Sequence, residues 1–190
     1  MELVMKQPTS FFETLQKLIP QKGGNIVYEE EGILGKGISL TSALRHIQRE
    51  LGNIEANSTL FIIDRYFTLA NNTLANNKKR QTQAKAYASQ LYDWVEKTGI
   101  REVNIYSNPS QTFKDVVTEQ FDGRISLHWG ESNKDIHDRL WIIKNEQGVH
   151  GVMVGSSLSD FGKSFTLVCP IPQIDIDQLA ELLRQHGIPI

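Results

Sequence analysis

The stretch that decides the fold is DIHDRLWIIKNEQGVHGVMVGSSLSDFGKSF, from Asp135 to Phe165. It contains two apolar runs separated by the polar turn KNEQG. Two such runs around a short turn are typical of an antiparallel β-hairpin. The pattern therefore predicts strands over 138–143 and 149–154, joined by that turn.

Polar residues lie where we expect the open end of this hairpin. His137 and Arg139 stand at the start of the first strand, and Ser156 and Ser157 follow Gly155 at the end of the second. Because residues two apart in a strand share a face, the alternation predicts that His137 and Arg139 point to the same side. The hairpin would bring both close to the serines. An imidazole, a cation and hydroxyl groups are then expected at one site.

Each of these residues also has a structural interpretation. A single histidine at the start of a strand is often a hydrogen-bonded structural residue. Ser157 is suited to capping a short helical turn, with Asp160 three positions later. Backbone N–H groups at such a turn, together with the serine hydroxyls, would also suit a phosphate. The sequence leaves both interpretations open.

Helical and strand patterns alternate through the rest of the chain. The segment EEEGILGKG, over 29–37, is predicted to be a loop. Helices are expected over 11–19, 42–51, 81–97, 111–119 and 175–185, and strands over 26–28, 59–63, 103–106, 124–129 and 165–168. This order predicts an α/β fold with a mixed, mostly central β-sheet flanked by helices.

Length and charge bound the number of domains and the class of function. With 190 residues, 39% of them hydrophobic, the chain is long enough for one substantial core. We expect an N-terminal segment, residues 1–58, to pack on a domain of residues 59–190 as one unit overall. The formal net charge of -2 argues against a surface built entirely for nucleic acid.

Apolar runs and cysteine content predict a cytoplasmic protein without a membrane partner. The apolar runs are far shorter than the roughly 18 residues of a membrane span. The N-terminus MELVMKQPTS lacks the pattern of a signal peptide, and the single Cys169 cannot form an internal disulfide. Because no cysteine cluster or closely spaced histidine pair is present, we expect no metal and no cofactor.

One segment is locally basic. From Arg65 to Leu91 the chain contains no aspartate or glutamate. Such a segment is able to follow a phosphate backbone, which makes nucleic acid an expected partner. A solvated loop leading into an exposed helix face would have the same composition. The basic residues of the segment are Arg65, Lys78, Lys79, Arg80 and Lys85.

Two stretches resemble the phospholipase D superfamily, especially its small members with one motif per chain. They are IHDRLWII from Ile136, followed by VMVGSSLSDFGKSF, and LFIIDRYF from Leu60, which is similar to the strand ending in Asp-x-Tyr that opens the domain in many members. The resemblance covers about Leu60 to Phe165. It implies a phospholipase-D-like fold and a metal-independent phosphodiesterase.

The resemblance also implies a mechanism and an assembly. In active members with one motif per chain, a homodimer brings two histidines to one phosphodiester. One histidine attacks phosphorus to form a phosphohistidine, the other protonates the leaving oxygen, and water completes hydrolysis. His137 would be the nucleophile or general acid. Arg139 would neutralise the phosphoryl oxygens with help from Ser156 or Ser157.

The sequence departs from the family motif at three positions. Arg139 stands where lysine is usual, Lys144 stands near the usual place of an acidic residue, and Leu158 replaces an asparagine. Arginine keeps the charge but presents it on a planar fork of donors. Asp64 and Glu131 are the candidates to replace the missing acid, although Asp64 also suits a turn or cap.

Three functions remain open on the sequence. The leading expectation is a nuclease or related phosphodiesterase that acts on DNA or RNA as a homodimer. The alternative is a catalytically inactive phospholipase-D-like module that binds nucleic acid or a partner protein. A lipid phosphodiesterase is disfavoured because the sequence shows no amphipathic membrane-binding segment. Small members that resemble this chain often belong to bacterial defence or mobile-element systems, where a protein partner is expected.

Overall fold

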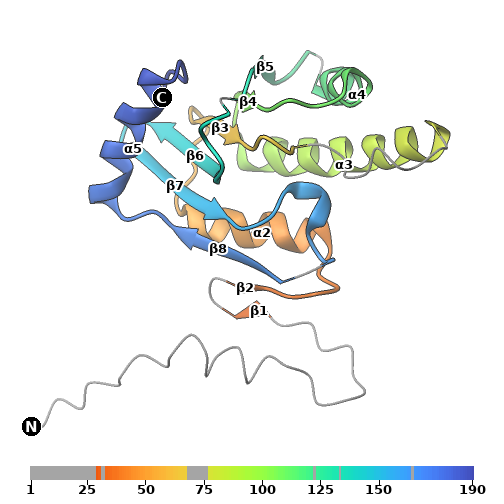
Figure 1. Cartoon of the computed structure of the whole chain (residues 1–190), viewed down its shortest axis with the longest axis horizontal. Helices are drawn as coiled ribbons and strands as arrows, with labels where there is room; N and C mark the ends of the chain where they lie inside the picture. The colour runs from red at the N-terminus through yellow and green to blue at the C-terminus, as the bar shows by residue number, and fades with distance from the viewer. Residues whose placement is uncertain (1–28, 31–32, 68–76, 122, 133, 164) are drawn as a thin grey trace, which may run out of the picture.

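One mixed β-sheet runs through the part of the chain that the computed structural model describes, residues 29–30, 33–67, 77–121, 123–132, 134–163 and 165–190. Within these residues, eight strands lie in the order β1-β2-β8-β7-β6-β3-β4-β5 (Figure 1). The helix predicted over 11–19 and the strand predicted over 26–28 lie outside the described residues. The strands are β1 (Glu29–Glu30), β2 (Ile33–Leu34), β3 (Thr59–Ile63), β4 (Glu102–Tyr106), β5 (Ser126–Gly130), β6 (Arg139–Asn145), β7 (Gly148–Val154) and β8 (Thr166–Pro170).

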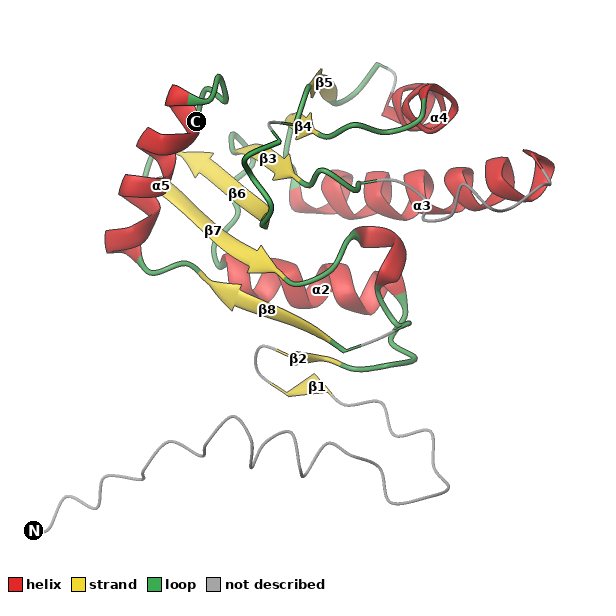
Figure 2. Cartoon of the chain, viewed as in Figure 1, coloured by secondary structure: helices red, strands yellow, loops and turns green. Residues whose placement is uncertain are grey.

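Helices cover both faces of this sheet. The helices α2, α3 and α4 pack on one face and α5 packs on the other, as Figure 2 shows for α2 and α5. Their bounds are α2 (Leu40–Leu51), α3 (Asn77–Thr98), α4 (Gln111–Phe121) and α5 (Gln173–Gln185), with a 3-10 turn η1 (Leu158–Asp160) after β7. The predicted fold class, an α/β domain with a mixed sheet flanked by helices, is confirmed.

The predicted hairpin is formed by β6 and β7. The two strands pair antiparallel, with Arg139 opposite Val154 at the open end and Asn145 opposite Gly148 at the turn. Gly148 has a φ of 130°, a conformation that side chains rarely allow, and this explains why glycine closes the turn. The hairpin therefore places Arg139 beside the segment that follows β7.

The central strand β3 brings a second group of residues to the same edge of the sheet. It runs parallel to β4 and antiparallel to β6, with Ile63 opposite both Tyr106 and Leu140. The carboxyl end of β3 consequently lies beside the first residue of β6. Asp64 and Arg139 meet at this edge because of that register.

Alternation along the strands divides the core between the two faces. Ile62 and Trp141 pack into the cluster under α2 and α3, whereas Ile63 and Leu140 pack into the cluster under α5. By the same alternation, the side chains of Asp64 and Arg139 point to the same face of the sheet as Ile62 and Trp141. Their meeting point is therefore on the α2–α3 face.

The loop predicted over 29–37 was wrong, because β1 and β2 form there. Ile33 pairs with Leu167 and Leu34 with Thr166 in an antiparallel ladder with β8. Leu34 is completely buried in the cluster under α2 and α3. Strands of two residues are too short to show the alternation that identifies a strand in a sequence.

Among the described residues, none of the helices combines the length and the apolar composition that crossing a bilayer requires.

Candidate functional site

Asp64 is the buried centre of the candidate site. It directly follows β3, and its side chain is only 2% exposed. Its Oδ1 atom accepts a hydrogen bond from the backbone N–H of Tyr66 at 2.8 Å and another from Ser157 Oγ at 3.0 Å. The Tyr66 contact is the local turn that the sequence suggested, and the Ser157 contact adds a long-range one.

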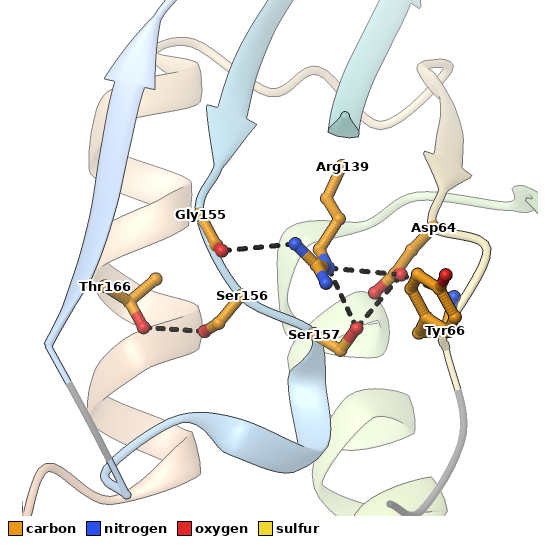
Figure 3. A network of polar contacts seen from close by, with 7 residues as sticks. All are labelled: Asp64, Tyr66, Arg139, Gly155, Ser156, Ser157 and Thr166. Carbon is orange, nitrogen blue, oxygen red and sulfur yellow. Dashed lines mark hydrogen bonds and ion pairs between the residues drawn. The ribbon is translucent and has the colours of Figure 1, made fainter. Parts of the chain in front are cut away.

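Arg139 is the cation of this site. Its Nε donates to Ser157 Oγ at 2.9 Å and lies 3.5 Å from Asp64 Oδ1, while its Nη1 donates to the Gly155 carbonyl oxygen at 3.1 Å (Figure 3). Its Cζ atom is 5.7 Å from the centre of the Tyr66 ring, within the range of a cation–π contact. These contacts hold the guanidinium in one orientation. The side chain is still 24% exposed, so a ligand is able to reach it.

The environment of Asp64 opposes its ionisation. Desolvation by burial raises the pKa of its carboxyl group above the ordinary value of 3.8, and Asp160 adds to this. The hydrogen bonds from Tyr66 and Ser157 and the charge of Arg139 act in the opposite direction but are outweighed. Arg139 therefore favours the ionised form of a carboxyl group whose burial favours the protonated form.

Ser156 and Ser157 have different partners. Ser156 Oγ lies 2.6 Å from Thr166 Oγ1, which ties the end of β7 to the start of β8. Ser157 occupies the N-cap position of η1, as predicted, but its hydroxyl makes no capping hydrogen bond and binds Asp64 instead. The short helical turn predicted here is therefore formed, and the expectation that its backbone N–H groups hold a phosphate stays a prediction.

The structure does not bring His137 into the Arg139 cluster. Strand β6 begins at Arg139, so His137 lies in the preceding loop, and the alternation that predicted a common side does not extend to it. Its exposed side chain lines a hollow on the α5 side with Leu140 and Met153. His137 makes no hydrogen bond or ion pair with a described residue. The expected common orientation of His137 and Arg139 was wrong for this reason.

The remaining predicted site residues lie outside the cluster of Asp64, Arg139 and Ser157. Arg65 is partly buried, and its Nη1 donates to the Lys134 carbonyl oxygen at 3.5 Å. Lys85 is exposed on α3. Glu131 is exposed after β5 and makes no hydrogen bond or ion pair with a described residue, so Asp64 is the acid that accompanies Arg139.

Lys78, Lys79 and Arg80 lie in the first turn of α3, which begins at Asn77, before the predicted start at 81. Their side chains lie outside the described part of the structure. The expectation that this basic segment follows a phosphate backbone stays a prediction.

The chemistry available at the site follows from what is exposed. Ser157 is 1% exposed, so its hydroxyl positions Arg139 and is not accessible as a nucleophile. The Nη2 group of Arg139 makes no hydrogen bond with a described residue, which leaves donors for an anion. No group of three histidine, cysteine, aspartate or glutamate side chains among the described residues is placed to hold a metal ion.

Sequence reasoning missed two contributors to this geometry. The Gly155 carbonyl oxygen accepts from Arg139, and Thr166 holds Ser156. A backbone carbonyl has no signature in the residue types. Thr166 is ten positions from Ser156 along the chain, and only the pairing of β7 with β8 brings the two together.

Comparison with known proteins gives one structural likeness. No protein-family model matches the sequence, and no curated protein matches it. Among solved structures, the chain is similar to polyphosphate kinase from Porphyromonas gingivalis, with 13% sequence identity and a TM-score of 0.47. The likeness covers 91% of this chain and 24% of that one. The chain thus spans about a quarter of the length of that kinase.

Proposed function

We propose that the protein binds nucleic acid and that Arg139 contacts a phosphodiester group. The observation that carries this proposal is that the Arg139 side chain is held in one orientation and is still partly exposed. Ser157, Gly155 and Asp64 fix the guanidinium, yet the Arg139 side chain is still 24% exposed. A planar fork of donors suits phosphate oxygens, and a fixed fork loses little rotamer freedom on binding.

Burial separates the roles of the two charged residues. Asp64 lies behind the guanidinium and is almost inaccessible, so it orients Arg139 without meeting the ligand. Tyr66 is 53% exposed, and Arg139 Cζ and Arg65 Cζ lie 5.7 Å and 5.8 Å from the centre of its ring. An arginine next to an exposed ring is a combination that suits single-stranded nucleic acid, because every base has a face that stacks.

A binding experiment with a matched control tests this function. We expect Arg139→Gln to weaken the binding of a fluorescein-labelled single-stranded oligonucleotide by at least about tenfold, or about 1.4 kcal/mol. The control is Arg101→Gln, because Arg101 is exposed and precedes β4 at the opposite edge of the sheet. Fluorescence anisotropy gives both dissociation constants. Equal weakening by the two substitutions would reduce Arg139 to one charge among many and contradict the proposal.

A second candidate function is the metal-independent phosphodiesterase that the family resemblance implies. The observation in its favour is His137, whose exposed imidazole stands two residues before Arg139 and has no partner among the described residues. In this proposal a homodimer pairs two His137 side chains across one phosphodiester. A role in bacterial defence or a mobile element, with a protein partner, rests on the resemblance alone.

Incubation with labelled DNA and RNA in EDTA separates the two candidates. Catalysis by His137 requires cleavage that persists in the chelator and disappears in His137→Ala, because a histidine nucleophile acts chiefly in the transition state. Oligonucleotide binding by the variant should remain. Binding without cleavage by the wild type would leave the non-catalytic module as the function.

A further inference from the structure

A hollow of about 370 Å³ lies between α5 and the ends of β6, β7 and β8. We call it the α5 groove. Its apolar lining includes Leu140, Met153, Ile171, Leu179 and Leu182. It lies on the opposite face of the sheet from the Arg139 site, so an inference about it does not rest on the proposed function.

The apolar lining of the α5 groove is unusually accessible. Met153 is 43% exposed and Leu182 is 50% exposed. Contiguous exposed apolar side chains with a polar rim are a feature of interaction sites on soluble proteins. Burial of this lining by a partner would therefore be favourable.

Acidic side chains outnumber basic ones on the rim of the groove. Asp135, Asp138 and Asp175 line it and are exposed. Among the described residues that line it, none is a lysine or arginine, and His137 is the one basic side chain. Such a rim attracts cations and repels an anionic lipid surface or a phosphate group. The acidic rim therefore favours an occupant with positively charged side chains.

We propose that the α5 groove docks an amphipathic segment of a partner protein in which apolar side chains alternate with lysine or arginine. The apolar side chains enter the groove between Leu140, Met153 and Leu182, and the basic side chains meet the three aspartates. The volume is near the lower end of the roughly 300–1,000 Å³ of ligand pockets, which suits a few anchor side chains. The protein thus has a peptide-docking site separate from its anion site.

A synthetic peptide with a leucine face and a lysine face is the probe. We expect it to bind the full chain in a fluorescence-anisotropy titration and to bind more weakly as salt is raised. A second peptide replaces every lysine by glutamate, and a third keeps all residues in an order without an apolar face. Both should bind at least about tenfold more weakly.

Two pairs of variants locate the binding. Leu182→Gln and the double variant Asp138→Asn with Asp175→Asn should each weaken binding of the leucine–lysine peptide by at least about fivefold. The matched controls are Ile174→Gln and Asp177→Asn, because both residues are exposed on α5 and neither lines the groove. The controls should leave the dissociation constant unchanged.

Several results would overturn the inference. These are no binding up to about 1 mM peptide, equal binding of the reordered peptide, or equal effects of groove and control variants. Analytical ultracentrifugation tests the other possible occupant of the groove, which is a second copy of the chain. If the wild-type chain self-associates and Leu182→Gln abolishes this while the peptide does not compete, the groove is a contact between copies of the chain.

Discussion

Replacing Trp141 by alanine is expected to lower the free energy of unfolding by about 3–5 kcal/mol, the usual cost of removing a large aromatic side chain from a core. Trp141 is 2% exposed in the middle of β6. Its ring packs edge to face against Trp94 of α3, with the centroids 5.7 Å apart. It therefore links the central sheet to the helix layer beneath the candidate site.

Denaturant unfolding measures this loss, with Leu182→Ala as the control. Leu182 is half exposed on α5, so its truncation should change the free energy of unfolding far less than that of Trp141. The surrounding side chains are close-packed and relax only partly around the missing indole. If the two substitutions cost the same, Trp141 is not the packing link between sheet and helices.

Replacing Arg139 by alanine is expected to lower the free energy of unfolding by about 1–3 kcal/mol at neutral pH, because Asp64 and Ser157 lose their partner. The cost should depend on pH. The folded-state pKa of Asp64 is already raised, so the stabilisation linked to its proton is complete at low pH and is lost as pH rises through that folded pKa. Without Arg139 the folded pKa rises further, and the ionised carboxyl group becomes more costly.

The difference in unfolding free energy between wild type and Arg139→Ala should consequently grow as the pH rises from below the ordinary carboxyl value of 3.8 through the raised folded-state pKa of Asp64. Denaturant titrations at a series of pH values measure it. In an Asp64→Asn background the same arginine substitution should show no such pH dependence, because no carboxyl group titrates there. If Arg139→Ala lowers the free energy of unfolding by the same amount at low and at high pH in the protein that keeps Asp64, then Asp64 and Arg139 are not coupled.

The sequence predicted the hairpin and the central strand well, because their signals are local. The run LWII and the turn before Gly148 identify β6 and β7, and the buried run before Asp64 identifies β3 with its bounds. Asp64 and Arg139 were both recognised as candidates. Their contact depends on the antiparallel register of β3 and β6, which no local pattern specifies.

Other predictions failed because strand bounds and long-range contacts are not specified by a local sequence pattern. The common side of His137 and Arg139 was predicted from strand alternation, but β6 starts at Arg139 and the alternation does not apply to the loop before it. Ser157 has the residue type of a helix cap, yet a buried carboxylate 93 positions away along the sequence binds its hydroxyl. The ladder of β2 with β8 is set by long-range pairing, and Ile33–Leu34 alone carries no strand signal.

The most direct test of the central claim is to observe the Arg139 guanidinium while nucleic acid binds. In the protein labelled with ¹⁵N-arginine, the Arg139 Nε signal should shift in step with saturation by a single-stranded oligonucleotide, and the Arg101 signal should not. An Arg139→Gln spectrum assigns the signal. Saturation of the protein with oligonucleotide while the Arg139 signal stays unchanged would contradict phosphodiester binding at this site.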